Sequence, residues 1–406
     1  MATPMVHSPE KPARRHDIDA LRVLAVLLLI YFHSARAFDH ESWHIKNGEL
    51  SKGLGTFVGF VDLWHMPLFF LLAGASTWLA LGRRSGRQYI LERVRRLFVA
   101  LLFGCLVVVP PQVYVERISP WSAPRQSPIN FEGTYLQFYT HFFSGIYPEG
   151  NFSWHHLWFV AYLLTYSLVA LPLVLWMRRP KRGQPFIHRL TRAMAEGPWL
   201  LLACVPIIVA EMVLRGKFST THALYNDWAA HAHFILVFLY GCLLISDERI
   251  SEAVRRLKGL ALALALVSAA VLWLAFGAAA PYSPRYFAQI AGWIACQWCW
   301  LLAILGYGQA HLNRPHPLLP HAAEIAYPFY ILHQTVIVVL AHQVVRWHAS
   351  VAVKFLVLST ASLAATVVLC ELVRQFNVTR FLFGMPAKRR LARTDESRPE
   401  SEEKRP

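Results

Sequence analysis

Apolar runs of roughly 20 residues, the length of a membrane-spanning helix, recur along the whole chain between shorter polar segments. Such a run crosses ~30 Å of hydrocarbon as an α-helix. Hydrocarbon offers no partners to backbone N–H and C=O groups, so only helices and closed barrels span it. The composition agrees, because 55% of the 406 residues are hydrophobic and 16% are charged. The sequence therefore predicts an all-α fold, a polytopic bundle of transmembrane helices.

Lysine and arginine are distributed unevenly among the segments that join these runs. With the N-terminus in the cytoplasm, inner segments hold about 29 of the 40 Lys and Arg, the outer segments together with the outer ends of spans hold about 10, and Arg22 lies at the start of the first span. Because positive charge collects on the cytoplasmic side, we expect both termini to be cytoplasmic in a multi-pass protein of the plasma (inner) membrane. The net charge of +16 is thereby explained by topology, and no nucleic-acid partner is expected. The ten expected spans are residues 18–37, 55–81, 96–115, 155–177, 199–215, 228–246, 259–279, 286–308, 321–342 and 350–373.

The polar segments leave no room for a separate soluble catalytic domain. We divide the chain into a cytoplasmic N-terminal segment (1–16), a membrane domain (17–384) and a cytoplasmic tail (385–406). The tail mixes charges without an apolar pattern, which predicts disorder. The first span resembles a signal peptide with "ARA" at its end, but the charged residues inside it favour a retained helix. Any chemistry must then be done by the bundle and its loops.

The first span, "DIDALRVLAVLLLIYFHSARAF", contains Asp19, Arg22 and His33. At 100° per residue, the eleven residues from Arg22 to His33 end about 20° past three full turns, so both side chains share a face about 16 Å long. Polar groups are costly in lipid, so this face should point into the bundle or a watery cavity. The alternative is structural: Arg22 snorkels and pairs with Asp19, and His33 only bonds a neighbouring helix.

Further stretches extend the pattern: "MPLFFLLAGAS" at 66–76, "LERVRRLFVALL" from 91, "HHLWFVAYLL" from 155, "AYPFYILH" at 326–333 and "CELVRQFNVTRFLFG" at 370–384. Together with the first span they resemble the acyltransferase-3 family of integral membrane acyltransferases, over residues 14–384. The resemblance implies transfer of an acyl group, commonly acetyl or succinyl, from a cytoplasmic donor to a glycan or similar acceptor outside. The form "HLWFV" is closer to members that modify periplasmic glucans.

The resemblance also implies site residues. The family motifs are matched by Arg22 and His33 in the first span, Arg93 and Arg96 at the first cytoplasmic loop, residues 327–333, and Glu371 in the last span. Acyl transfer to a hydroxyl needs a base, and neutral histidine suits that role near neutral pH. We therefore expect His33 and Arg22 to be catalytic.

Arginines bind phosphate through forked, charge-assisted hydrogen bonds. Arg93 and Arg96 are therefore expected to bind the phosphates of acyl-coenzyme A, which acts as co-substrate, and no permanently bound cofactor is expected. Asp19 and Glu371 are assigned supporting roles, with Glu371 pairing with these arginines or with Arg22. A pair with Arg374, three residues further on, is the alternative.

The outer side carries many histidines and aromatic residues, which suit a glycan acceptor. We single out His155, His156 and Trp158 as acceptor-side candidates. The alternative is the interfacial aromatic belt, which places tryptophan and tyrosine there regardless of function. No metal site is expected, because no histidine spacing with carboxylates fits one.

A competing class is a transporter or exporter of a small anion or glycan without acyl chemistry, because intramembrane arginine and histidine also mark substrate pathways. The absence of an internal repeat in the sequence argues against it. The expected partners are the lipid bilayer, acyl-coenzyme A and an extracytoplasmic glycan. The sequence favours no particular oligomeric state, acyl group or acceptor.

Overall fold

The computed structural model describes residues 14–120, 130–275, 277 and 279–388. Within these ranges the fold is all-helical, as predicted, and the one β-type contact is an isolated bridge between Ile146 and Phe152. In chain order the helices are α1 (His16–Arg36), α2 (Lys52–Asp62), α3 (His65–Leu81), α4 (Gly86–Arg93), η1 (Val94–Phe98), α5 (Val99–Phe103), η2 (Gly104–Val108), α6 (Val109–Ile118), α7 (Tyr135–His141), η3 (His155–Leu157), α8 (Trp158–Val169), α9 (Leu171–Met177), α10 (Gly183–Ala195), η4 (Leu201–Cys204), α11 (Val205–Leu214), α12 (Trp228–Leu244), α13 (Glu248–Ala275), α14 (Pro284–His311), α15 (Leu319–Val344), α16 (Val351–Val373) and α17 (Asn377–Leu382).

Seven helical stretches are long and apolar enough to cross a membrane: α1, α2–α3, α4–α6, α13, α14, α15 and α16. The pair α8–α9, bent by 50°, makes an eighth if it is one span. The two remaining predicted spans coincide with shorter apolar helices, Leu201–Leu214 and Trp228–Leu244. At 1.5 Å per residue these are shorter than ~30 Å of hydrocarbon. The structure therefore supports a multi-pass helical membrane protein, and the count of ten spans stays a prediction.

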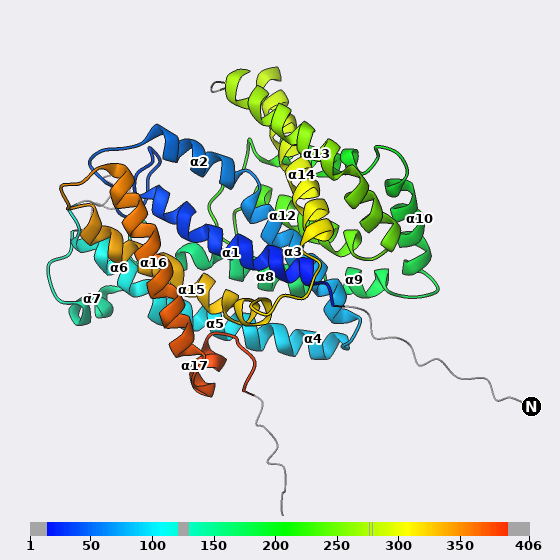
Figure 1. Ribbon diagram of the computed structural model, residues 1–406. Coiled ribbons are helices and arrows are strands. Elements are labelled where there is room, and N and C mark those ends of the chain that lie inside the picture. Colours follow the sequence, from blue (N-terminus) through cyan, green and yellow to red (C-terminus); the bar gives the residue numbers. More distant parts are fainter. Residues whose placement is uncertain (1–13, 121–129, 276, 278, 389–406) are drawn as a thin grey trace, which may run out of the picture.

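Helix α1 runs through the middle of the bundle and packs against α2, α3, α14, α15 and α16 (Figure 1). Helices α13 and α14 form the most extensively packed pair, and their far ends project from the rest of the molecule (Figure 1). This arrangement gives α1 neighbours on several sides. The polar face of α1, which carries Arg22 and His33, therefore faces other helices of the protein.

The helix ends collect into two groups at opposite ends of α1. At one, here called the arginine end, Arg22 of α1 lies within electrostatic range of Arg93 and Arg96. At the other, the histidine end, His44 from the α1–α2 loop bonds Glu116 of α6. Residues 384–388 return to the arginine end, where α1 also begins. The described parts next to both termini therefore share one end of the bundle, as the topology prediction requires, and its assignment to the cytoplasm stays a prediction.

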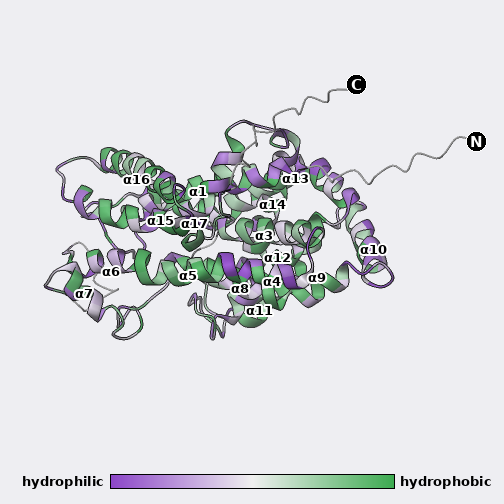
Figure 2. Ribbon diagram, turned by 90° about the horizontal axis from the view of Figure 1, so that it is seen from below, coloured by the Kyte–Doolittle hydropathy of each residue, from purple (hydrophilic) through white to green (hydrophobic). Residues whose placement is uncertain are grey.

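Many apolar side chains remain exposed on the outer helices. Examples on α13 and α16 are Leu266, Val267, Leu274, Leu356 and Leu372. Hydrophobic residues extend along α5 and α16, and hydrophilic residues are prominent on α10 (Figure 2). A soluble protein would bury such side chains, whereas lipid tails solvate them. The surface is that of a protein embedded in a bilayer.

Helices α3 and α12 meet without side chains between their backbones at Gly74 and Gly241. A Cβ on Gly74 would lie 1.9 Å from the carbonyl oxygen of Phe238, and one on Gly241 would lie 2.0 Å from that of Leu71. The small residues of segment 66–76 thus allow the two helices to approach closely. Forcing α3 and α12 apart would also disturb Ser76, the residue on α3 that binds Arg22.

Gly74→Ala is therefore expected to destabilise the protein by ~1–3 kcal/mol, the usual cost of overpacking. Thermal unfolding in detergent measures this change. Gly259→Ala is the matched control, because Gly259 also lies in a helix but nothing stands within 4 Å of its Cβ position. Equal melting temperatures for the two variants would contradict the close α3–α12 contact.

Candidate active site

The polar face of α1 turns inward, as its helical spacing predicts. Arg22 is partly buried and donates to Ser76 Oγ on α3 at 2.6 Å. Its other terminal nitrogen lies 3.4 Å from Asp19 Oδ1, and Asp19 also pairs with Arg14 at 2.8 Å. Ser76 in turn donates to the Leu72 carbonyl at 2.7 Å. Arg22 is thus held in one orientation by Ser76 of α3 and by Asp19 of its own helix.

Three arginines from two segments meet at the arginine end. The charges of Arg93 and Arg96 both act on Arg22. Arg93 lies over the ring of Tyr89 at 4.8 Å. The hydroxyl of Tyr327, from α15, is buried among these arginines and has no hydrogen-bond partner in the described part of the chain. Guanidinium groups concentrated in this way, with an unsatisfied hydroxyl beside them, suit a ligand that carries several anionic oxygens.

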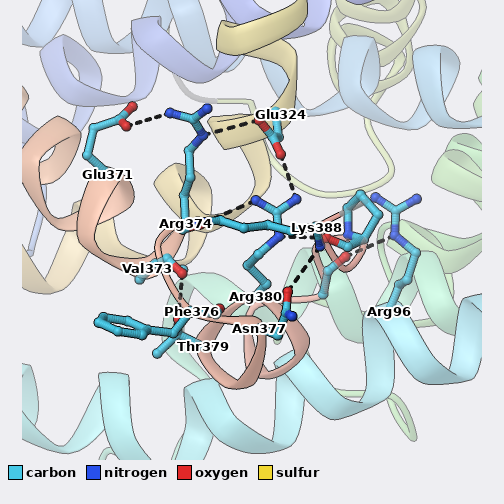
Figure 3. A network of polar contacts seen from close by, with 12 residues as sticks. Arg96, Glu324, Glu371, Val373, Arg374, Phe376, Asn377, Thr379, Arg380 and Lys388 are labelled. Atoms are coloured by element: carbon cyan, nitrogen blue, oxygen red, sulfur yellow. Dashed lines mark hydrogen bonds and ion pairs between the residues drawn. The ribbon is translucent and has the colours of Figure 1, made fainter. Parts of the chain in front are cut away.

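The C-terminal segment fixes one of these arginines. Arg96 Nε donates to the Gly384 carbonyl at 2.9 Å (Figure 3). Its Nη1 lies 3.3 Å from Glu92. Gly384 adopts φ +67°, and a Cβ there would lie 2.3 Å from the Arg96 carbonyl oxygen. Only glycine fits this turn. The segment after α17 therefore holds the Arg96 side chain by a backbone contact.

Residues 385–388, assigned to the tail by the sequence, belong to this docked segment. The Pro386 carbonyl accepts from Arg380 Nε at 2.7 Å, and the backbone N–H of Lys388 donates to Asn377 at 3.0 Å. Met385 is buried. The predicted disordered tail from 389 onward, like the predicted N-terminal segment up to residue 13, lies outside the described residues.

Glu371 does not pair with Arg22, Arg93 or Arg96, so that predicted pairing is wrong. Its carboxylate lies 2.8 Å from Arg374 (Figure 3). It also lies 2.8 Å from His321 of α15. Arg374, three residues further along the chain, lies next to Glu371 because of the helix geometry alone, so this pair does not depend on how distant segments pack. The same network continues through Glu324, which binds both Arg374 and Arg380. Glu371 therefore anchors α15 to the C-terminal segment and reaches the arginine end only indirectly.

At the histidine end, His33 lies beside two aromatic groups from other segments. Its ring centroid is 5.1 Å from that of His333 on α15 and 6.2 Å from that of Trp43, on which it stacks at 23°. His33 Nδ1 is buried and has no hydrogen-bond partner among the residues that the structure describes. We call His33, His156 and His333 the histidine cluster, because the His156 ring lies 5.2 Å from that of His333.

The three acceptor-side candidates separate in the structure. His156 belongs to the histidine cluster, and His155 lies one step away, with its ring 4.8 Å from that of His44. Trp158 does not join them, because its indole stacks on His222 at 4.3 Å. Trp158 therefore packs against His222, outside the histidine cluster. Burial lowers the pKa of His222 there.

The comparisons with known proteins bear on these two ends of the bundle. The profile of the acyltransferase 3 family, an acyltransferase domain, matches residues 15–373. The chain belongs to the acyltransferase 3 family. The match includes both ends of α1, the paired arginines, the box at 327–333 and Glu371. The family identified from the sequence motifs is thus confirmed.

Curated relatives of this acyltransferase 3 protein share shorter stretches with it. A "Glucans biosynthesis protein C" of Salmonella gallinarum is 24% identical over 179 residues, which cover 42% of this chain and 41% of the relative. The protein of the same name from Escherichia coli is 26% identical over 105 residues, covering 26% of this chain and 27% of the relative. The matches thus span less than half the length of these relatives. No solved structure matches.

Sequence reasoning missed a second polar group at the histidine end of this family member. Glu116 is fully buried, and its Oε2 lies 2.6 Å from His44 Nδ1. The other nitrogen of His44 contacts Gln334 at 3.1 Å. Burial, and then the charge of Glu116, raise the pKa of Tyr147 well above its usual value, so the phenol stays protonated and donates to Glu116 at 3.0 Å. The available signal was the charged pair of Glu116 and Arg117 at the end of an apolar run.

The loop between α1 and α2 places Trp43 and His44 over the bundle. Its centre is Asp39, which is fully buried and pairs with Arg36 at 2.7 Å and Lys46 at 2.8 Å.

Despite the histidines at this end, no three His, Cys, Asp or Glu side chains in the described ranges are arranged to hold a metal ion. The chemistry open to this end is proton transfer and hydrogen bonding by neutral imidazoles.

Proposed function

We propose that this protein transfers an acyl group, of acetyl or succinyl type, from a cytoplasmic acyl-coenzyme A to a hydroxyl of an extracytoplasmic glycan. One observation carries the proposal: a single helix, α1, holds an arginine among further arginines at one end and an inward-facing histidine at the other. The two positions are about 16 Å apart along the helix. This distance suits a donor whose phosphates and reactive carbonyl are separated by a long arm.

In this proposal the arginine end faces the cytoplasm and receives the donor. Arg93 and Arg96 bind phosphate oxygens through charge-assisted hydrogen bonds, and Arg22 lies further along the path. The pantetheine arm extends along α1 toward His33. The positive-inside distribution of charge supports this orientation in the inner membrane.

At the histidine end His33 acts as general base. A neutral ring nitrogen takes the proton of the acceptor hydroxyl as its oxygen attacks the thioester carbonyl. The tetrahedral intermediate then collapses, the carbon–sulfur bond breaks, and the same proton passes from His33 to the departing thiolate. The products are an ester and coenzyme A with a free thiol, and the enzyme returns to its starting protonation state.

The acceptor is proposed to be a glycan because the curated relatives carry the name glucans biosynthesis protein C. His155, whose ring lies 4.7 Å from that of Tyr147, and the neighbouring His156 offer ring nitrogens for polar contacts at the histidine end. Aromatic faces and hydrogen-bonding side chains together suit sugar rings. Trp158 lies further from His33 than these two histidines, and it stays a candidate for an outlying contact with the acceptor.

The test uses purified protein in detergent with acetyl- or succinyl-coenzyme A and a periplasmic-type glucan. We expect glucan-dependent release of the coenzyme A thiol and, by mass spectrometry, one acyl ester per thiol released. A transporter would release no thiol under any combination of donor and acceptor. Thiol release without ester formation would mean hydrolysis and would contradict transfer to the glycan.

Gly384→Ala is expected to weaken donor binding through Arg96. The substitution places a side chain against the Arg96 backbone, so the 2.9 Å bond from Arg96 to residue 384 should break. Loss of one hydrogen bond that orients the guanidinium should raise KM for acyl-coenzyme A roughly 2–10-fold, at little change in kcat.

Gly197→Ala is the control for this variant. Gly197 also has a positive φ, +59°, but nothing lies within 4 Å of its Cβ position. Both substitutions therefore strain the backbone, and only one displaces Arg96. An equal KM for acyl-coenzyme A in the two variants would show that Arg96 does not bind the donor.

A further inference from the structure

The backbone fixes the proton positions on two of the three rings of the histidine cluster. His333 Nδ1 lies 2.6 Å from the Tyr330 carbonyl oxygen, which can only accept, so Nδ1 carries the proton. His156 Nε2 lies 2.9 Å from the Ile331 carbonyl oxygen and is protonated for the same reason. In a neutral imidazole the other nitrogen is then a bare acceptor. His333 thus presents Nε2 and His156 presents Nδ1, each as a lone pair.

Both bare nitrogens are buried and have no partner in the described structure. They cannot satisfy each other, because neither has a proton to donate. Unsatisfied buried acceptors are costly, so a donor group is expected beside them. His33 is the one ring of the cluster whose proton position no backbone contact fixes, and its buried Nδ1 also has no partner.

In the described part of the chain no carboxylate bonds His33, although a carboxylate usually orients a catalytic histidine. The groups that act most strongly on it electrostatically are basic: His333, His156, Arg36 and His65. Two buried carboxylates at the histidine end are already engaged: Glu116 by His44, and Asp39 by Arg36 and Lys46. A general base needs a third group that sets its tautomer, and here that group must be a neutral acceptor.

We propose that His333 is the positioning residue for His33: its bare Nε2 accepts the Nδ1–H of His33. The rings lie 5.1 Å apart with a tilt of 48°, and a rotation of the partly buried His33 ring brings the two orphaned nitrogens together. His33 Nε2 is then left unprotonated and free to take the acceptor hydroxyl's proton. The proton on Nδ1 stays in place throughout, so the proposal rests on the proposed function and adds no step to it.

His333→Phe and His333→Gln test the inference. Phenylalanine keeps a buried ring but removes the acceptor, so kcat should fall on the order of 10–10²-fold while KM for acyl-coenzyme A stays unchanged. Glutamine supplies a carbonyl acceptor and should restore most of kcat. A role in packing alone predicts the opposite order, because phenylalanine is the better match in shape.

His342→Phe is the matched control on the same helix. His342 is buried too, but its ring nitrogens contact Ser119 at 3.0 Å and Arg346 at 2.7 Å, away from the histidine cluster. Its kcat should equal that of the unmodified protein. A wild-type kcat in His333→Phe would overturn the inference, and so would a matched fall of kcat in both phenylalanine variants.

A measurement on the unsubstituted protein covers the case in which His333→Phe does not fold. In ¹⁵N-histidine-labelled protein, nitrogen resonances distinguish protonated from bare ring nitrogens, and His33→Gln identifies the signals of His33. We expect His33 to be protonated at Nδ1 and bare at Nε2; the reverse tautomer would overturn the inference. If the unmodified protein transfers no acyl group at all, the proposed function fails, and the tautomers are still measurable.

Discussion

Replacing His33 by glutamine is expected to lower the rate of acyl transfer on the order of 10²–10⁴-fold, the usual contribution of a general base. Glutamine keeps hydrogen-bonding capacity and a similar volume but cannot take a proton near neutral pH. Binding of acyl-coenzyme A should remain normal, because the arginines lie at the other end of α1. Single-turnover transfer by the purified variant, with donor binding measured in parallel, gives both quantities.

His65→Gln is the control for a histidine that only packs. His65 is buried close to α1, and its Nε2 donates to the Ala25 carbonyl at 2.8 Å, a bond that a glutamine amide can replace. This variant should retain most of its activity. Near-normal transfer by His33→Gln would remove His33 from the mechanism.

Arg93→Ala and Arg96→Ala should each weaken acyl-coenzyme A binding by about 10-fold or more, because a hydrogen bond to a charged group contributes about 1.5–3 kcal/mol. The rate at saturating donor should change much less. Lysine at either position should restore binding only in part, since it lacks the forked geometry of guanidinium. Binding of the donor to each purified variant, measured by calorimetry, separates affinity from turnover.

Arg95→Ala provides the comparison within the same turn of helix. Arg95 is exposed and lies over the Phe381 ring at 5.3 Å, so it belongs to the contact with α17 rather than to the group around Arg22. Its removal should leave donor affinity unchanged. If Arg93→Ala and Arg96→Ala also bind the donor normally, both arginines act only as topology determinants.

Periodicity within one helix was enough to predict the stripe on α1. The angle between Arg22 and His33 follows from helix geometry alone, and the cost of polar groups in lipid determines that they face inward. Which residues meet them was predictable only through the family motifs. The partner of His33 on α15 is 300 positions away in the chain, and helical spacing holds no information about such a contact.

Contacts made by loops and chain ends were missed for the same reason. Glu116 and His44 come from segments that a sequence pattern does not bring together, yet they form the shortest carboxylate–histidine contact of the histidine end, at 2.6 Å. Residues 385–388 were predicted to belong to a disordered tail, yet Pro386 and Lys388 bond residues of α17, directly after Gly384, whose φ of +67° is specific to a packed turn. The Glu371 prediction failed because a distant pairing was preferred to the neighbour three residues on.

Sidedness of transfer in proteoliposomes tests the central claim most directly. The protein is reconstituted in one orientation, with labelled acyl-coenzyme A on one side and the glucan on the other. Labelled ester should form only when the donor faces the arginine end and the glucan faces the histidine end. Ester formation that requires donor and glucan on the same side, or movement of glucan across the bilayer without ester formation, would contradict the account.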